Sequence, residues 1–433
     1  MSRQYEIRDP VHGFIALNEW EWEIINHPVF QRLRRIRQLG LTDMVYPGAV
    51  HTRFEHSLGV MHVATRMFDS LVARERDFLT SEDMGFHDEG LKRERAIVRL
   101  AALLHDCGHA PFSHVAEDLM PVNGRTNRRY KHEDFSAAII RVTLKDVIEN
   151  HRHNDRNYRI KADEVAQLID GDKALSLGRR GLWKSLISSQ LDADRADYLL
   201  RDSHHAGVAY GRYDLDRVIV TLRLGISPEP ETPVVVLDKS GIHAAEALIL
   251  ARYMMFTQVY FQKTRRIYDL HLQEAMRVVF GERAFPSPES EKELQDYLDW
   301  DDWKVAGLIR AGKGGDAGDK ILSRCHDRMV FETAENPSVD EMEHYEDRRQ
   351  RLEREIPETR DDCAETQWYK VEAGIGILEN ESKGKSFVDL SNMSGVVKGL
   401  LGCNQHRLYV PHERRETARE ILGNVKQMAK ETA

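Results

Sequence analysis

Three separated segments of the sequence carry histidine and aspartate side chains that can bind a metal ion. They are HTRFEHSLG at 51–59, HDCGHAPFSH at 105–114 and LDADRADYLLRD at 191–202. A lone histidine or aspartate is usually a hydrogen-bonded core or capping residue, but three such segments together point to a site. Two imidazoles and two carboxylates form the mixed nitrogen and oxygen set of a catalytic divalent ion rather than of a structural zinc. We therefore predict a metal site formed by His56, His105, Asp106 and Asp194.

Such a site suits the hydrolysis of phosphate esters. A divalent ion lowers the pKa of bound water and polarises a phosphoryl oxygen, so it supplies nucleophile and electrophile together. The leaving oxygen of a nucleoside also needs a proton donor, and histidine supplies one near neutral pH. His109 and His114 follow His105 within one segment and are candidates for this role. They could instead orient phosphate or bind a second metal, and for His114 a buried, hydrogen-bonded position is an open alternative.

The elements that position these residues are expected to be mainly helical. Apolar residues recur at helical spacing over 28–39, 55–72, 95–106, 186–204 and 244–277. A small β hairpin is expected around VVVLD at 234–238. After about residue 333 a highly charged stretch is expected to form an exposed helix or linker. Strands are expected in WYKVEAGIGIL and SFVDL, followed by a closing helix behind Pro411.

Bulk composition indicates a soluble globular protein without a membrane segment. The 433 residues can bury a large core and form two or three domains. A net charge of −9 with 31% charged residues argues against a general nucleic-acid coat, although a local basic pocket for phosphate stays open. The four cysteines form no CxxC pair, which fits a reduced, cytoplasmic setting. No signal peptide or membrane-spanning stretch is evident in the sequence.

The chain resembles the HD-superfamily phosphohydrolases, in particular the deoxynucleoside triphosphate triphosphohydrolase branch, with the sterile-alpha-motif/HD-domain dNTPase and bacterial dNTPases. The similarity covers about residues 6–330 and includes IRDPVHGFIAL and FQRLRRIRQLG besides the three metal segments. The resemblance implies a mainly α fold, with a helical HD-type catalytic domain over 1–333 and a small β hairpin. A charged linker and a small α/β C-terminal lobe are expected over 334–433.

The resemblance also implies a catalytic group and a bound ion. The four predicted metal ligands match the positions that hold the metal in the family. His132, in KHEDFS, resembles the family's other active-site histidine segment, and Glu117 stands where relatives carry a carboxylate, although Asp118 could take its place. The expected catalytic group is therefore His109, His114, His132 and Glu117. The expected ion is manganese, iron or magnesium, with nickel or zinc as ions that a purified sample could carry.

A substrate pocket follows partly from helical spacing and partly from the resemblance. Asp194, Tyr198 and Asp202 are spaced i, i+4 and i+8, so they line one face of a helix. By the same spacing, Asp197 and Arg201 are interpreted as a plain intrahelical ion pair. In the dNTPase relatives, substrate contacts come from positions matching Arg53, Arg195, Tyr198, Asp202, Arg252, Tyr260 and Lys263. Phe256 departs from the family, because close relatives have a histidine there.

Deoxyribose recognition is expected at RQLG, where the family's sugar-reading pair occurs. Gln38 can bond the 3′-hydroxyl, and the apolar Leu39 would leave a ribose 2′-hydroxyl unpaired or crowded. An unsatisfied polar group costs about 1–3 kcal/mol, which is enough to favour deoxyribose. The resemblance further implies an allosteric nucleotide site at a subunit interface, formed by Gln31, Arg34, Arg217 and Lys239. Asn26 and Tyr5 replace an expected aspartate and lysine, which argues against GTP as the effector.

The leading hypothesis is a metal-dependent enzyme that hydrolyses dNTPs to deoxynucleoside and inorganic triphosphate. The alternative is an HD-type phosphodiesterase, nuclease or phosphatase acting on another nucleotide or on a single-stranded nucleic-acid end. A nucleotide-sensing module without turnover is a third class, against which the presence of all four ligands argues. The expected assembly is a homo-oligomer, a dimer or tetramer. A nucleotide effector and weak binding of single-stranded nucleic acid stay open as partners.

Overall fold

The structure is a computed structural model that describes residues 4–170, 178–228, 231–281, 284–369, 374–380 and 385–423. The chain forms two compact units that are interleaved in the sequence. The first comprises Met1–Met255, Glu282–Val305 and Lys370–Lys398, and the second comprises Phe256–Gly281, Ala306–Tyr369 and Gly399–Ala433. The expected boundary at 333/334 lies inside a segment of the second unit, so the two divisions of the chain differ. The functional division into a catalytic domain and a C-terminal lobe stays a prediction.

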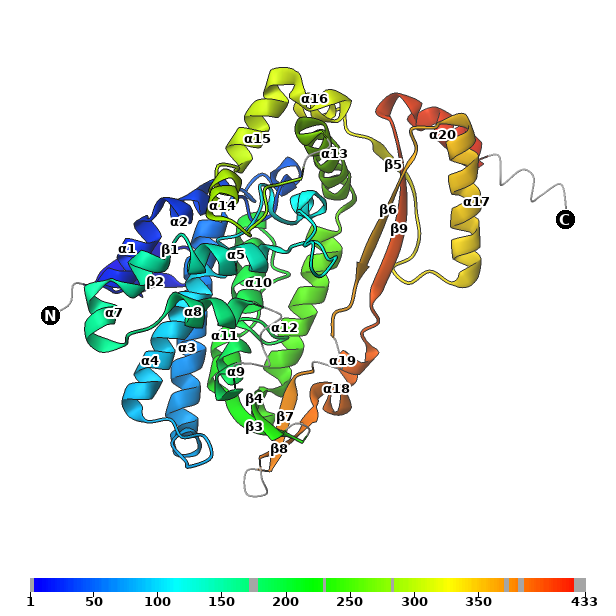
Figure 1. Cartoon of the computed structure of the whole chain (residues 1–433). Helices are drawn as coiled ribbons and strands as arrows, with labels where there is room; N and C mark the ends of the chain where they lie inside the picture. The colour runs from blue at the N-terminus through cyan, green and yellow to red at the C-terminus, as the bar shows by residue number, and fades with distance from the viewer. Residues whose placement is uncertain are drawn as a thin grey trace. The chain divides into compact units, whose positions relative to one another are not determined.

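The first unit is mainly helical, as expected (Figure 1). Its helices are α1 (Glu19–Asn26), α2 (Pro28–Arg32), α3 (Arg53–Leu79), α4 (Asp88–Leu104), α5 (His132–Arg141), α6 (Lys145–Glu149), α7 (Arg152–Asn157), α8 (Ala162–Ile169), α9 (Gly181–Lys184), α10 (Ala193–Ala206), α11 (Leu215–Val220), α12 (Ile242–Met255), α14 (Glu291–Leu298) and α18 (Leu390–Met393). Two further helices, α15 (Asp302–Leu308) and α19 (Gly395–Gly399), contain residues of both units.

Helices α3, α4 and α10 form the frame of the predicted metal site, since α3 packs against both of the others. Helix α3 begins at a capping box in which Thr52 and Glu55 satisfy free backbone N–H groups. Helix α10 begins where the Asp192 side chain accepts the N–H of Arg195, and it ends at Gly207 in the left-handed conformation. The buried apolar face of α4 continues to Leu104, directly before His105. The predicted ligands therefore lie at helix ends, where local capping sets the backbone.

The expected hairpin is confirmed, and it belongs to a larger sheet in the first unit. Strands β3 (Leu222–Pro228) and β4 (Glu231–Leu237) pair antiparallel, and β7 (Gly376–Asn380) pairs parallel to β4. Strand β8 (Ser386–Asp389) completes the order β3-β4-β7-β8. The strand expected in SFVDL is confirmed at 386–389, whereas only the end of WYKVEAGIGIL, from residue 376, belongs to a strand, and its residues 370–373 lie outside the described residues. Strands β7 and β8 both extend the sheet of the hairpin. A second hairpin, β1 (Tyr5–Asp9) and β2 (Gly13–Leu17), precedes the helices.

The second unit combines helices with a three-stranded antiparallel sheet of order β5-β9-β6. Its elements are a π-helical turn (Phe256–Tyr260), α13 (Lys263–Phe280), α16 (Gly315–Ser323), β5 (Arg328–Glu332), α17 (Val339–Glu355), β6 (Arg360–Thr366), β9 (Cys403–Val410) and α20 (Arg415–Gly423). The charged stretch after residue 333 is confirmed as a helix, α17, which buries only Tyr345 and Leu352. These side chains pack with Leu408 and Ala418 into a small core.

Several expected helices have different ends because side chains cap or interrupt them. The helix expected over 28–39 ends at Arg32 and continues as a 3₁₀ turn to Arg35. The helix expected over 244–277 is two helices, because the Gln262 side chain accepts backbone N–H groups and starts α13 anew. The helix expected over 186–204 begins only at Ala193, where Asp192 caps it. The segment DKILSRCHDRMVF, at 319–331, also has the apolar spacing of a helix, but it is helical only to Ser323, and its end pairs with β9 as strand β5.

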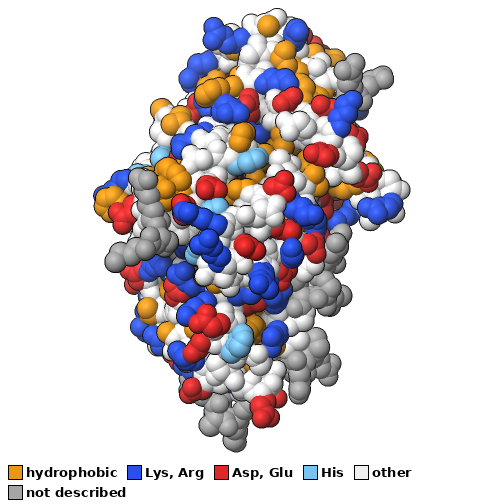
Figure 2. All heavy atoms as spheres, turned by 60° about the vertical axis from the view of Figure 1, so that its left-hand side comes forward, with side chains coloured by type: hydrophobic (Ala, Val, Ile, Leu, Met, Phe, Trp, Pro, Cys, Tyr) orange, Lys and Arg blue, Asp and Glu red, His pale blue; other side chains and the backbone are white. Residues whose placement is uncertain are grey.

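The described surface mixes charges of both signs. Figure 2 shows a face on which Lys and Arg side chains are interspersed with Asp and Glu, in keeping with the net charge of −9. Within the part of the chain that the structure describes, no helix is both long and apolar enough to cross a membrane.

Candidate active site

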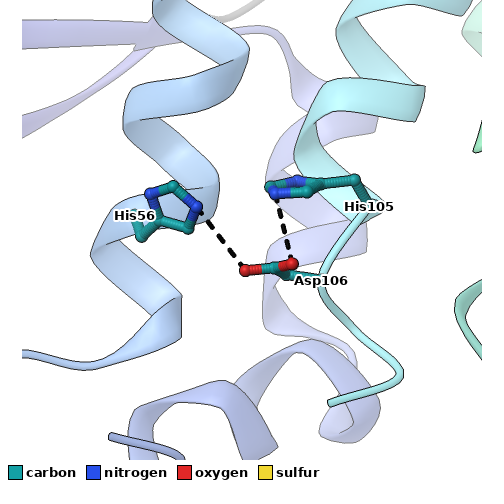
Figure 3. Close-up of side chains that lie close together, drawn as sticks. All are labelled: His56, His105 and Asp106. Carbon is teal, nitrogen blue, oxygen red and sulfur yellow. Dashed lines mark ion pairs between the residues drawn. The ribbon is translucent and has the colours of Figure 1, made fainter. Parts of the chain in front are cut away.

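Three of the predicted metal ligands converge on one buried point, and the fourth lies beside them. His105 Nε2 lies 3.2 Å from Asp106 Oδ1, and His56 Nε2 lies 3.5 Å from Asp106 Oδ2 (Figure 3). Asp194 Oδ1 lies 3.1 Å from His56 Nε2 and 3.9 Å from His105 Nε2. His56, His105 and Asp106 are buried, and the Asp194 side chain is 37% exposed. The four side chains thus offer nitrogen and oxygen atoms to one point, reached from the exposed side of Asp194.

The hydrogen bonds of the two histidines fit a cation at this point. Nδ1 of His56 lies 2.8 Å from Asp197 Oδ2, and Nδ1 of His105 lies 2.8 Å from the carbonyl oxygen of Ala102. Each Nδ1 therefore donates, which leaves the Nε2 lone pair directed at carboxylates. Both Nε2 atoms are buried and make no hydrogen bond among the described residues. A lone pair facing a carboxylate is repulsive unless a positive charge lies between them, so these residues fit a divalent ion.

The same carboxylates shift the pKa values of the cluster. Burial opposes a charge on His56, but the carboxylates of Asp194 and Asp197 outweigh it and raise the pKa of His56 to about 10. Burial likewise opposes ionisation of Asp106, yet Arg53 and the neighbouring histidines hold the Asp106 pKa well below its ordinary range. The cluster therefore attracts positive charge, which either a proton or a metal ion can supply.

Asp197 has a role that the sequence interpretation missed. Its ion pair with Arg201 is confirmed, with Arg201 Nε donating over 2.8 Å, but Asp197 also accepts hydrogen bonds from His56 and from His12 Nε2 at 2.6 Å. Arg201 in turn donates to Asp9 over 2.8 Å. Asp197 and Arg201 are fully buried, so they are not an ion pair on a solvent-exposed helix face. The pair instead orients the predicted metal ligand His56. The sequence held one indication of this role, because Asp197 lies three residues after the predicted ligand Asp194 and therefore near it on the helix.

The predicted catalytic histidines lie next to the metal ligands. His109 Nε2 lies 3.3 Å from Asp106 Oδ1, and the ring of His132 stacks on His109 with centroids 3.8 Å apart. Burial lowers the pKa values of both His109 and His132, so both rings are neutral near pH 7. His114 is exposed and its Nδ1 lies 2.6 Å from Glu117 Oε1. The structure thus brings all four predicted catalytic residues together, and the alternative of a buried His114 is wrong.

Two further features surround this histidine group. Phe112 and Ser113 adopt positive φ angles of 57° and 58°, a conformation that non-glycine residues hold only where contacts enforce it. The carboxylate of Asp302 supplies such a contact by accepting the N–H of Phe112 over 2.7 Å. Glu133 was missed by the sequence analysis, although it directly follows His132. Its Oε2 lies 3.4 Å from His132 Nδ1.

Comparison with known families identifies the architecture. The profile described as "HD domain" matches residues 53–202, which contain all four metal-ligand candidates. A second profile, described as "HD associated region", matches residues 214–432.

The chain belongs to the HD superfamily of phosphohydrolases.

Individual relatives of this HD protein agree with the assignment. The uncharacterized protein YwfO of Bacillus subtilis is 33% identical over 364 residues, covering 80% of this chain and 75% of that protein. The crystal structure of a hypothetical protein from Aquifex aeolicus has a TM-score of 0.77 at 30% identity, covering 97% of this chain and 100% of that one. The deoxynucleoside triphosphate triphosphohydrolase SAMHD1 of Bos taurus is 33% identical over 219 residues. That match covers 47% of this chain and 36% of SAMHD1.

Within this HD protein, the residues expected to contact phosphate are already engaged by carboxylates. Arg53 donates to Asp106 over 2.5 Å and to Ser113 Oγ over 2.9 Å, so it joins the metal ligands to the histidine loop. Arg195 donates to Asp192 over 2.5 Å. Both arginines thus have fixed positions beside the cluster. Arg252 belongs to the same unit, and burial raises the pKa of Tyr198 to about 12 against the opposing charges of Arg252 and Arg195.

His51 joins two of the predicted substrate residues, Gln38 and Asp202. The His51 ring lies 2.7 Å from Asp202 Oδ1, and its carbonyl oxygen accepts the backbone N–H of Gln38 over 3.1 Å. Gln38 Oε1 is buried and makes no hydrogen bond among the described residues. Leu39 is buried beside it in the chain. His51 was not selected from the sequence, although it begins the first metal segment.

The remaining predicted residues, two for substrate contact and four for the allosteric site, lie outside the metal-ligand cluster. Tyr260 and Lys263 belong to the second unit, whereas the metal cluster belongs to the first. Gln31 and Arg34 contact each other, with Arg34 Nε donating to Gln31 Oε1 over 2.9 Å. Arg217 and Lys239 are exposed, and Arg217 donates to the carbonyl oxygen of Ser240 over 3.0 Å. The allosteric role of these four residues stays a prediction.

A cavity of about 160 Å³ reaches the cluster from the side of Asp194. Its walls include the ligand residues His105 and Asp194 together with His132 and Glu133. Three cations also line it, namely Arg128, Lys131 and Lys184. The carboxylates of Glu133, Asp134 and Asp194 line the same cavity, so cationic and anionic side chains are mixed next to the metal ligands.

Proposed function

We propose that this HD phosphohydrolase converts dNTPs to deoxynucleoside and inorganic triphosphate. The observation that supports the proposal is that the metal-ligand cluster and the residues predicted to contact the sugar lie in the same compact unit. The buried cluster of His56, His105 and Asp106, with Asp194 beside it, lies next to the histidine group, and Asp202 links through His51 to Gln38. Helix α10 carries both Asp194 and Asp202, so a nucleotide along its face reaches both sites. The 33% identity to SAMHD1, named as a deoxynucleoside triphosphate triphosphohydrolase, supports this substrate class.

Different residues are assigned to metal binding and to proton donation. His56, His105, Asp106 and Asp194 would hold a divalent ion, which when bound supplies activated water and polarises the phosphoryl group. His114 is the proton donor to the leaving 5′-oxygen, because it is exposed and paired with a carboxylate, whereas burial keeps His109 and His132 neutral. Burial opposes charge on Glu117, but its hydrogen bond with His114 holds its pKa low. Glu117 therefore remains anionic and accepts the hydrogen bond from His114 Nδ1.

Discrimination between sugars is assigned to the residues around His51. Gln38 Oε1 is buried with no hydrogen-bond partner among the described residues, so a 3′-hydroxyl can donate to it. The apolar side chain of Leu39 and the half-buried ring of Tyr198 leave a 2′-hydroxyl unsatisfied. Manganese, iron or magnesium is the proposed ion. Effector binding by Gln31, Arg34, Arg217 and Lys239 and a dimeric or tetrameric assembly are further parts of the proposal.

A product assay tests the proposed reaction. The protein is incubated with each dNTP and each ribonucleotide, and anion exchange separates triphosphate, pyrophosphate and phosphate. Inorganic triphosphate together with deoxynucleoside is the expected product pair, and the Asp106→Ala variant should release neither. Release of pyrophosphate would refute attack at the α-phosphorus with a nucleoside leaving group. Equal turnover of ATP and dATP would refute the sugar assignment.

A larger cavity that adjoins this one favours a second candidate, a phosphodiesterase or nuclease acting on a longer anion. The 160 Å³ cavity shares Arg128 and Asp134 with a larger cavity of about 790 Å³, which Arg125 and Arg141 also line. None of Gln38, Tyr198 or Asp202 lines either cavity. A single strand with its end at the cluster would follow these arginines. Nucleotide release from a 5′-labelled single-stranded oligonucleotide, lost in Asp106→Ala, would favour this candidate.

A further inference from the structure

A second group of potential ligands lies outside the primary cluster. His114, Glu117 and His132 each offer one ligand atom, and these atoms lie within 4.8 Å of one another. His114 Nδ1 lies 2.6 Å from Glu117 Oε1, and His132 Nδ1 lies 4.0 Å from the same oxygen. The His114 side chain is 66% exposed and that of Glu117 is 47% exposed. An ion from solution can therefore reach this group directly.

The two nitrogens of His132 face different groups. Nε2 lies 4.0 Å from Asp106 Oδ1 in the primary cluster, whereas Nδ1 faces Glu117 and lies 3.4 Å from Glu133 Oε2. Nδ1 is buried and has no hydrogen-bond partner among the described residues. Stacking on His109, with the ring planes 17° apart, holds the ring in this orientation. The outer group therefore uses an atom that the primary ligands do not use.

We propose that His114, Glu117 and His132 form a second metal site that takes a nitrogen-preferring transition-metal ion, with Zn²⁺ as the representative case. Two imidazole nitrogens and one carboxylate are a common protein ligand set for zinc, and they leave a coordination position for water. Imidazole ligands favour zinc, copper or nickel, whereas magnesium and calcium prefer oxygen. The carboxylate of Glu133 lies close enough to His132 Nδ1 to support the ion from a fourth side.

Occupation of this site would inhibit the enzyme, a consequence that rests on the proposed function. An ion bound to Nδ1 of His114 replaces the proton that this nitrogen shares with Glu117. The hydrogen bond between His114 and Glu117, on which the proposed proton donation depends, is then lost, while His56, His105, Asp106 and Asp194 keep their own ligand atoms. The protein would thus need one divalent ion and be inhibited by another.

Zinc stoichiometry tests the site independently of turnover. Metal-free protein is dialysed against buffered Zn²⁺, and bound zinc per chain is measured by elemental analysis. His114→Asn and Glu117→Gln should each bind one zinc ion less than the unaltered chain, and the Asp194→Ala background should show the same difference. The matched control is His243→Asn, because His243 forms a similar i, i+3 pair with Glu246 at 2.7 Å. Among the described residues, this pair has no third potential metal ligand close to it. Equal zinc content in Glu117→Gln and the unaltered chain would overturn the site.

Inhibition provides the second readout. With manganese held constant, excess Zn²⁺ should lower dNTP turnover of the unaltered chain by at least about tenfold, since a general acid contributes about 10²–10⁴-fold to such reactions. Excess Zn²⁺ should lower the dNTP turnover of Glu117→Gln much less, when the rate is compared with the rate of the same variant without zinc. Absence of dNTP turnover would refute the proposed function, yet the zinc count would still decide the site. Unchanged zinc content with intact turnover would refute the site alone.

Discussion

At the scale of single residues, the candidate site depends on which atom of each side chain is already engaged. His56 and His105 donate through Nδ1 to Asp197 and to the Ala102 carbonyl oxygen, so Nε2 of each ring is directed at the cluster. Carboxylates that accept from a ligand histidine fix its tautomer and raise its basicity. Asp197 is therefore as much a part of the metal site as the ligands it orients.

Replacing Asp197 should weaken metal binding without removing any ligand. Asp197→Asn removes the negative charge behind His56, and we expect the affinity for Mn²⁺ to fall by about 10–100-fold. Calorimetric titration of metal-free protein measures this change. Asp216→Asn is the matched control, because Asp216 is an exposed partner of Arg66, with its side chain 80% exposed. A folded Asp197→Asn protein, judged by its melting temperature in chelator, that binds Mn²⁺ normally would contradict the assignment.

Sugar selectivity should depend on Tyr198. Removing its ring with Tyr198→Ala opens the space beside the 2′-carbon, so the preference for dATP over ATP, expected to be roughly tenfold or more, should narrow. Arg195→Ala is the contrasting variant, because loss of a phosphate contact should weaken both substrates alike. Competition assays with paired dATP and ATP give the ratio directly. An unchanged ratio in Tyr198→Ala would refute its role.

At the scale of elements, the site requires close approach of α3 and α10. Gly59, three residues after His56, faces Asp197 and Arg201 across this contact. A Cβ atom on Gly59 would lie 1.9 Å from Asp197 Oδ1 and 2.4 Å from an Arg201 nitrogen. Both of these partners are fully buried, so neither can move aside into solvent. The missing side chain at Gly59 thus permits the hydrogen bonds that orient His56.

Gly59→Ala should therefore destabilise the protein, by about 1–3 kcal/mol as for other overpacked cores. It should also reduce metal affinity, because Asp197 must shift. Gly307→Ala is the control, since Gly307 lies in helix α15 and a Cβ atom there would have no neighbour within 4 Å among the described residues. That change should be neutral or stabilising by up to about 1 kcal/mol, from helix propensity. Melting temperatures of the two variants, compared in one buffer, would contradict this account if Gly59→Ala were the more stable.

A buried carboxylate ties the catalytic loop to the sugar-reading segment. Asp302 accepts the N–H of Phe112 over 2.7 Å and that of Arg37 over 2.8 Å. Burial raises the pKa of Asp302 to about 7, even though these N–H groups and the nearby Arg37 and Arg32 lower it. The folded protein therefore binds this proton more tightly than the unfolded chain does. The resulting stability is present below about pH 4 and is lost as the pH rises through about 7.

Asp302→Asn tests this pH dependence, because it removes the ionising group while keeping one acceptor oxygen. The difference in melting temperature, unaltered chain minus variant, should be largest at about pH 5 or below and should shrink or reverse by about pH 8. The measurement is a series of thermal melts in buffers across this range. A difference that grew with pH would show that Asp302 is ionised in the folded protein throughout.

At the scale of the whole molecule, the two compact units are interleaved along the chain, and the assembly state is open to a direct test. The segment 31–37 resembles one that relatives bury between subunits, so we expect a homo-oligomer, a dimer of dimers with closed symmetry. Light scattering at micromolar concentration, with and without dNTPs, measures the mass. A monomeric mass under both conditions would count against assembly and against the allosteric residues Gln31 and Arg34.

The sequence by itself determined the chemical identity of the candidate site and the mainly helical class. Residue types and short-range spacing carry that information, because His and Asp side chains are common ligands of divalent ions and helix faces repeat every three or four residues. The same reasoning located the hairpin and the charged helix α17. It also placed Asp194, Tyr198 and Asp202 on one helix face.

Only the tertiary structure decided which residues, distant in the sequence, contact the predicted site residues. Asp197 meets His56 across 141 positions of the chain, and His51 meets Asp202 across 151, distances over which periodicity holds no information. Strand β7 joins β4 to extend a sheet of the first unit, and the end of a helix-like pattern becomes strand β5, because long-range backbone pairing overrides local propensity. The exposure of His114 and the shielding of His132, which separate a proton donor from a neutral ring, likewise follow from packing that no local pattern encodes.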